Sequence, residues 1–82
     1  MTRIEALGVV IRDARTRRSI SQEKLAAFAK LHRNALGRIE RSEVALNLNT
    51  LWLIADAMGV TASELVQEAE ILAATDEQAS SA

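Results

Sequence analysis

Residues 21–40, SQEKLAAFAKLHRNALGRIE, decide the fold of this chain, because they encode two short helices joined by a tight turn. Ser21 is suited to cap the first helix, since its hydroxyl can accept a hydrogen bond from a free backbone N–H, and Glu23 complements the positive helix end. Apolar residues then repeat at helical spacing: Leu25, Ala26 and Ala29. The small side chains among them would let a second helix pack closely across the first.

The second helix of the pair is predicted at about residues 33–41, after a turn at residues 30–32. Leu36 and Ile39, at positions i and i+3, give this helix an apolar face. The opposite face carries residues suited to base edges and phosphates: Arg33, Asn34, Gly37 and Arg38. A pair of this kind is typical of a helix-turn-helix that docks on DNA.

The charges of the chain are divided between its two halves. The first 41 residues hold all ten Lys and Arg residues and four acidic residues, a balance of +6, whereas the remaining residues hold seven acids and no base, a balance of −7. The net charge of −1 therefore hides a strong dipole and is no argument against a polyanionic partner. The alternative is a helical protein whose surface charge is uneven for no functional reason.

Length and composition narrow the class of protein. A chain of 82 residues makes one domain that buries only roughly 60–65% of its unfolded surface, so a dimer interface would help to stabilise it. There is no Cys and only one His, so we expect no metal and no cofactor, and no grouping of residues suggests an enzyme. No long apolar run or signal-peptide pattern is present, so we expect a cytoplasmic protein.

The rest of the chain also reads as helical, because it lacks proline and its apolar residues recur at i, i+3 and i+4. Further helices are predicted at about residues 4–17, 48–58 and 62–73. Asn47 is the expected N-cap of the fourth helix, whose inward residues would be Leu48, Leu51, Ile54 and Ala55. Gly59 would end that helix, and Thr61 with Glu64 would form a capping box for the fifth. Residues 1–74 would form the domain, and residues 75–82 a flexible tail.

Three stretches together resemble a known family. They are R-x-x-R-x-x-x-S-I-S-Q-E-K-L-A at residues 12–26, L-H-R-N-x-L-x-x-I-E-R at 31–41 and L-x-x-I-A-D-A-M-G-V at 51–60. They resemble the Cro–repressor or xenobiotic-response-element family of five-helix, lambda-repressor-like DNA-binding domains. Within it, L-H-R followed by I-E-R is most similar to the small controller proteins of restriction–modification systems. The resemblance implies an all-α transcriptional regulator that binds double-stranded DNA as a dimer, with RNA polymerase as a further candidate partner.

Roles in DNA binding follow from chemistry and from the resemblance. Arg33 suits guanine and Asn34 suits adenine in bidentate contacts, and Arg38 could meet either a base or a phosphate. Gly37 could let the helix approach the groove, or could simply be tolerated. The resemblance implies phosphate contacts from Gln22 and Asn47. Further candidates for contact with the backbone or for general attraction are Arg12, Arg17, Arg18 and His32, although a turn role for His32 is equally open.

Two other features concern structure. The second helix of the pair, at about residues 33–41, corresponds to the recognition helix of this family. The resemblance implies that Arg15 of the first helix pairs with Glu40 at the end of the recognition helix, so these residues are assigned a structural role. The chain departs from the family at Lys30, which stands where a glycine often adopts the left-handed conformation. A non-glycine residue there costs on the order of 1 kcal/mol, so either the turn tolerates it or the local backbone differs.

The last two predicted helices carry more apolar side chains than one core stripe needs. We expect a twofold interface between these helices in two subunits, formed by Trp52, Leu53, Leu65, Val66, Ala69 and Leu72. Such a dimer would place two recognition helices about one DNA turn apart, roughly 34 Å, on a pseudo-palindromic operator.

Three functions are alternatives to a restriction–modification controller. The chain could be a phage or plasmid repressor, an antitoxin, or a protein-interaction module that has lost DNA binding.

Overall fold

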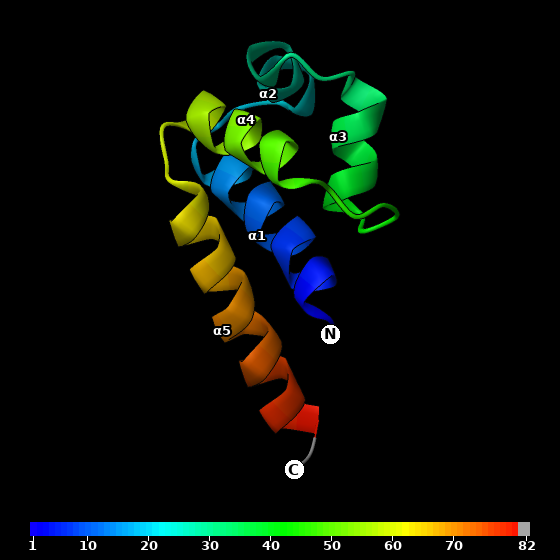
Figure 1. Ribbon diagram of the computed structural model, residues 1–82, viewed down its shortest axis with the longest axis vertical. Helices are drawn as coiled ribbons and strands as arrows, with labels where there is room; N and C mark the ends of the chain where they lie inside the picture. Colours follow the sequence, from blue (N-terminus) through cyan, green and yellow to red (C-terminus); the bar gives the residue numbers. More distant parts are fainter. Residues whose placement is uncertain (81–82) are drawn as a thin grey trace.

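The computed structural model describes residues 1–80, with side chains described as far as residue 77. The described chain contains five helices and no strand (Figure 1). The helices are α1 (Arg3–Arg17), α2 (Gln22–Ala29), α3 (Arg33–Glu40), α4 (Leu48–Met58) and α5 (Ala62–Ser80). The prediction of an all-α, five-helix fold is confirmed.

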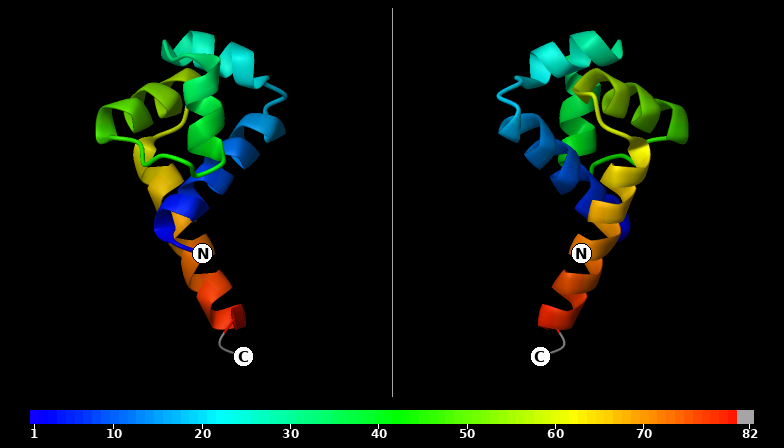
Figure 2. Two further views of the ribbon diagram at one scale, coloured as in Figure 1. Left: turned by 90° about the vertical axis from the view of Figure 1, so that its right-hand side faces the viewer. Right: turned by 90° about the vertical axis from the view of Figure 1, so that its left-hand side faces the viewer.

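Helix α1 packs against α3 and α5, and α4 packs against α2 and α5. In Figure 1, α3 lies on the right of α1, α5 runs antiparallel to α1 on its left, and α2 lies at the top. The side views show α5 continuing beyond the start of α1 toward the C-terminus (Figure 2). The helix pair α2–α3 is therefore held at the end of the molecule opposite the free end of α5.

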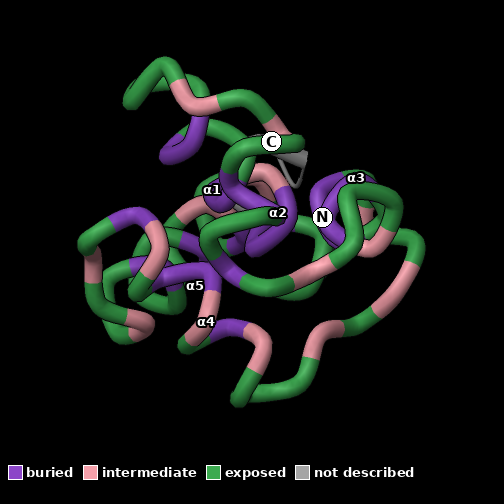
Figure 3. Tube along the Cα trace, turned by 90° about the horizontal axis from the view of Figure 1, so that it is seen from above, coloured by how far each residue is buried: buried purple, intermediate pink, exposed green. Residues whose placement is uncertain are grey.

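A single core joins all five helices. The largest fully buried side chains are one from each helix: Ile11, Leu25, Leu36, Ile54 and Leu65. Figure 3 shows buried residues recurring among exposed ones along the chain, as expected for helices that each turn one apolar face inward. Small buried residues such as Ala26 and Ala29 of α2 let its neighbours approach closely.

The helix ends follow the local sequence signals. Asn47 Oδ1 accepts a hydrogen bond from the Thr50 N–H at 2.8 Å, and Thr61 Oγ1 accepts one from the Glu64 N–H at 3.1 Å. Gly59 ends α4 in the left-handed conformation, with φ of 73°. The sequence analysis missed the capping box of α1, in which Thr2 and Glu5 bond to each other's backbone N–H and start the helix at Arg3.

Two expectations about the last helices are corrected. Leu48 was expected to face inward but is 58% exposed, because it is the first residue of α4 and lies at the edge of the core. The fifth helix continues past residue 73 to Ser80, since Ala73 is still buried against the core and no Gly or Pro follows to end it. The expected tail therefore begins within α5, and its last two residues lie outside the described residues.

Candidate nucleic-acid interface

The turn between α2 and α3 fixes the position of the recognition helix. Ser21 Oγ accepts the Lys24 N–H at 3.0 Å at the start of α2. At its end Lys30 adopts the left-handed conformation with φ of 59°, so of the two alternatives open for this position the turn tolerates a non-glycine residue. The Leu31 N–H then donates to the Ala26 carbonyl at 2.8 Å. These bonds close the turn tightly before α3 begins.

The helix α3 has one buried and one exposed face. Leu36 and Ile39 lie in the core and hold the helix in place. Arg33, Asn34 and Arg38 are exposed, so three of the four expected base-reading residues have side chains at the surface. Arg33 and Asn34 occupy the first turn of α3, and His32 is its exposed N-cap, without a side-chain capping bond.

Gly37 is the exception, and its expected outward position is corrected. The glycine is buried, because the guanidinium group of Arg41 covers it. A Cβ atom added at Gly37 would lie 3.0 Å from Arg41 Nη1. The sequence analysis gave no role to Arg41, which forms an ion pair with Glu43 in the following loop.

A network of polar side chains ties α3 to the two preceding helices. Arg15 and Glu40 form the pair expected from the resemblance, with Arg15 Nε 2.7 Å from Glu40 Oε2 and both residues buried. Gln22 Nε2 donates to Glu40 Oε1 at 2.9 Å. One hydrogen of the Gln22 amide is therefore used inside the protein, and the second remains available for another partner.

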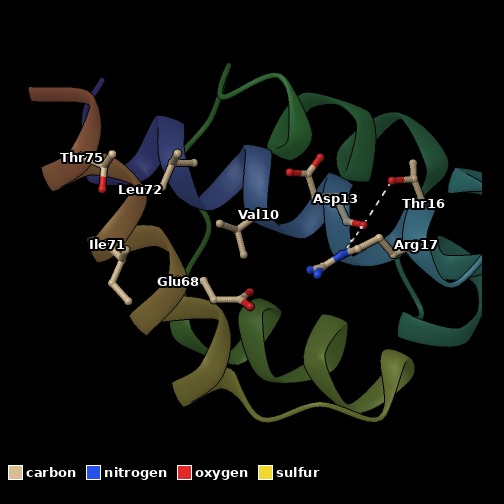
Figure 4. A pocket seen from close by; sticks show the side chains of 8 residues that line it. All are labelled: Val10, Asp13, Thr16, Arg17, Glu68, Ile71, Leu72 and Thr75. Atoms are coloured by element: carbon tan, nitrogen blue, oxygen red, sulfur yellow. Dashed lines mark hydrogen bonds between the residues drawn. The ribbon is translucent and has the colours of Figure 1, made fainter. Parts of the chain in front are cut away.

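Three further arginines in α1 or at its end, Arg12, Arg17 and Arg18, lie on two sides of that helix. Arg12 lines a polar pocket with Arg15, Gln22, Glu40 and Arg41, next to the start of α2. Arg17 and Arg18 instead line a pocket with two acids of α5, Glu64 and Glu68. Figure 4 shows Arg17 on this side, where its Nε donates to the Asp13 carbonyl at 3.3 Å. The structure thus separates Arg17 and Arg18 from the exposed face of α3.

A second polar flank lies between α3 and α4. Arg38 and Asn47 line the same groove, together with Leu31, Ala35 and Thr50. Asn47 is at the start of α4, where its Oδ1 caps the helix and its amide nitrogen has no hydrogen bond to another described residue. The exposed face of α3 is therefore flanked by Arg12, Gln22 and Arg41 on one side and by Asn47, next to Arg38, on the other.

The expected dimer surface is divided in the structure. Leu65 and Ala69 are 1% and 3% exposed and belong to the core of one chain, so their expected place on a subunit surface is corrected. Leu53 and Leu72 are half-buried against the same core. Trp52, which is 51% exposed, and Val66 line a shallow groove between α4 and α5. The predicted dimer interface was too broad, because the central apolar stripe of α5 packs into the core of its own chain.

Comparison with known proteins identifies the family of this chain. Residues 11–65 match the helix-turn-helix family, and the chain belongs to it, in the Cro–repressor or xenobiotic-response-element type. The protein is a DNA-binding transcriptional regulator. None of the five helices, as far as they are described, is long and apolar enough to cross a membrane.

Individual relatives narrow the comparison. The chain is 36% identical over 62 residues to the control protein C.SmaI of Serratia marcescens, covering 76% of this chain and 74% of that protein. It is similar to the crystal structure of the restriction–modification controller protein C.AhdI from Aeromonas hydrophila, with a TM-score of 0.74, 31% identity, and coverage of 76% of this chain and 94% of the other. The clp gene regulator ClgR from Corynebacterium glutamicum shares the fold, with a TM-score of 0.84 at 23% identity, covering 96% of this chain and 88% of the other.

Proposed function

We propose that this protein is a controller of a restriction–modification system, which acts as a homodimer on pseudo-palindromic operators in the cytoplasm. The protein regulates transcription by occupying double-stranded DNA near promoters, without a catalytic step and without a cofactor. RNA polymerase is the partner through which such occupancy would act. The similarity to C.SmaI and C.AhdI supports the restriction–modification context.

The observation that carries the proposal is the exposed first turn of α3. Arg33 and Asn34 project from a helix whose opposite face, with Leu36, is locked into the core. Helix ends of this kind enter the major groove of DNA, where Arg pairs with guanine and Asn with adenine. We assign base reading to Arg33 and Asn34, with Arg38 one turn later.

Contacts to the DNA backbone would lie on both flanks of α3. Gln22, at the start of α2, offers an amide hydrogen and a free helix N–H, and both are suited to a phosphate. Asn47 and His32, at the starts of α4 and α3, would also meet the backbone. Arg12 adds positive charge on the flank that also holds Gln22, whereas Arg17 and Arg18 contribute only long-range attraction.

Selection of bound duplexes from a random pool tests this function. We expect enrichment of an inverted repeat whose half-sites are about one helical turn apart, roughly 34 Å. The Arg33→Ala variant should fail to enrich the same sequence, whereas Arg17→Ala, which removes an equal charge on the α5 side, should enrich it. Failure of the unmodified protein to enrich any duplex at low salt would overturn the proposed function.

A further inference from the structure

Arg41 is a basic residue at the end of the recognition helix to which the proposed function gives no role. It is the C-cap of α3, and its backbone N–H donates to the Gly37 carbonyl at 3.0 Å. Arg33, Gly37 and Arg41 follow one another at intervals of four residues, so they lie along one side of the helix. The side chain of Arg41 extends back along this side, toward the base-reading turn.

Gly37 provides the space for this side chain. Because the residue has no Cβ, the guanidinium group of Arg41 can lie directly against the helix backbone, where an added Cβ would be 3.0 Å from Nη1. The arginine side chain remains 60% exposed, so its outer face is open to a ligand. The glycine that weakens this helix by about 1 kcal/mol thus has a structural consequence, which is the close seating of an arginine.

The surroundings of Arg41 carry a surplus of positive charge. The polar pocket that it lines also contains Arg12 and the ion pair of Arg15 with Glu40. Arg15 and Glu40 neutralise each other, and Arg41 is paired with the exposed Glu43, so the charge of Arg12 remains unbalanced beside the start of α2. A phosphate group that approached Gln22 would therefore meet two arginines at this flank of α3.

The guanidinium group of Arg41 already forms an ion pair with a carboxylate of the protein itself. Arg41 Nε donates to Glu43 Oε2 at 2.5 Å, and the two side chains are 60% and 50% exposed. The loop enforces this pairing, because Ser42 adopts the left-handed conformation with φ of 60° and the Glu43 N–H donates to the Arg38 carbonyl at 2.9 Å. Glu43 is thus turned back toward the residue that would contact DNA.

We propose that Arg41 contacts the phosphate backbone of DNA and that Glu43 is its built-in competitor. On binding, a DNA phosphate replaces the carboxylate as the partner of the guanidinium, which can form bidentate bonds with a phosphate. Exposed ion pairs of this kind are weak, so the exchange is readily reversible. Glu43 then lowers the affinity for DNA of any sequence, because a phosphate must displace its carboxylate from Arg41. This inference rests on the proposed function, since it assigns a further contact on the same DNA-binding face.

Fluorescence anisotropy with a selected operator and a scrambled duplex, at several salt concentrations, tests the inference. We expect Glu43→Gln to tighten binding to both duplexes by about 2- to 10-fold. Arg41→Gln should weaken binding to both and reduce the slope of log K against log salt by about 1. In the double variant, the effect of Glu43→Gln should largely disappear, because the residue on which it acts is gone.

The matched control is Glu68→Gln, which removes the same charge on the α5 side of the molecule. Equal tightening by Glu43→Gln and Glu68→Gln would show a general charge effect and overturn the inference. An effect of Arg41→Gln confined to the operator would overturn the phosphate assignment in favour of a base contact. If the unmodified protein binds DNA and the double variant shows additive effects, the competitor role fails while the proposed function stands. No binding by the unmodified protein overturns both.

Discussion

Arg15 and Glu40 make a two-point ion pair inside the fold: Arg15 Nε donates to Glu40 Oε2 at 2.7 Å and Nη2 donates to Oε1 at 3.0 Å. The third guanidinium nitrogen, Nη1, donates to the Ile20 carbonyl at 2.9 Å. Gln22 donates to the same carboxylate from the start of α2. One carboxylate at the end of the recognition helix is therefore bonded to both preceding helices, which sets the orientation of the DNA-binding face.

Removal of Arg15 should destabilise the whole domain. In Arg15→Ala the carboxylate of Glu40 would remain buried without its cation, which typically costs about 3–5 kcal/mol. Because small domains are stable by only about 5–15 kcal/mol, the denaturation midpoint in urea should fall steeply. Arg12→Ala is the control, since Arg12 lies one turn earlier on α1 and is exposed. Similar midpoints for the two variants would contradict a structural role for the pair.

Gly8 and Gly37 should respond in opposite ways to the same substitution. A Cβ on Gly8 would lie 2.7 Å from the Ile39 carbonyl oxygen and 3.0 Å from that of Glu40, so α1 and α3 would have to separate. We expect Gly8→Ala to cost about 1–3 kcal/mol. Gly37→Ala meets only the end of the flexible Arg41 side chain, and it gains up to about 1 kcal/mol in helix propensity. Thermal denaturation of both variants checks this, and a stability loss at Gly37 as large as that at Gly8 would refute it.

The local signals of the sequence predicted most of the fold. The caps at Asn47 and Thr61 and the glycine at position 59 depend on a few neighbouring residues, so they could be recognised without tertiary information. The capping box of Thr2 and Glu5 was equally readable from its T-x-x-E spacing and was overlooked.

Other features could not be read from the chain, because they depend on contacts between distant segments. Nothing near Gly8 in the sequence indicates that the backbone of α3 passes against it. The apolar stripe of α5 predicts burial, but periodicity cannot tell whether Leu65 packs within its own chain or against another. The pairing of Arg41 with Glu43 depends on the left-handed turn at Ser42, for which the sequence carries no strong signal.

Base reading by Arg33 predicts a selective loss of affinity. Arg33→Ala should cost about 1–3 kcal/mol on the operator, because a bidentate contact to guanine is lost, and much less on scrambled DNA. Arg17→Ala should cause a small and equal loss on both duplexes, since it lies on the α5 side. Gel shifts on the two duplexes at matched salt measure the difference. Equal losses on both duplexes for Arg33→Ala would remove this residue from the base-reading set.

The start of α1 should loosen in acid. The Thr2 backbone N–H donates to Glu5 Oε1 at 2.7 Å, which lowers the pKa of Glu5 below its ordinary value of 4.5. Since the folded state has the lower pKa, the stabilisation by the capping box is present above pH 4.5 and is lost as the pH falls through the pKa of the folded state. The protection factors of the Thr2, Glu5 and Ala6 amides, which are measured by NMR relative to the intrinsic exchange rate at each pH, should therefore fall in that range. In Glu5→Gln, whose uncharged side chain does not titrate, this loss of protection should be absent, and its persistence would show another cause.

Self-association should depend on the α4–α5 groove and not on the α1–α5 face. Trp52 and Val66 are exposed in the first, whereas Ile71 lies with Val10 beside α1 (Figure 4). A charge in an apolar interface is strongly unfavourable, so Trp52→Glu should shift analytical ultracentrifugation profiles toward the monomer. It should also weaken binding to an inverted repeat far more than to a single half-site.

Ile71→Glu changes an equally exposed apolar residue and should leave both measurements near those of the unmodified protein. Leu65→Glu is unsuitable as a test, because its side chain lies in the core and the variant would unfold. If Ile71→Glu disrupts the dimer and Trp52→Glu does not, the subunits meet through the other face, and the spacing of the two recognition helices must be derived anew.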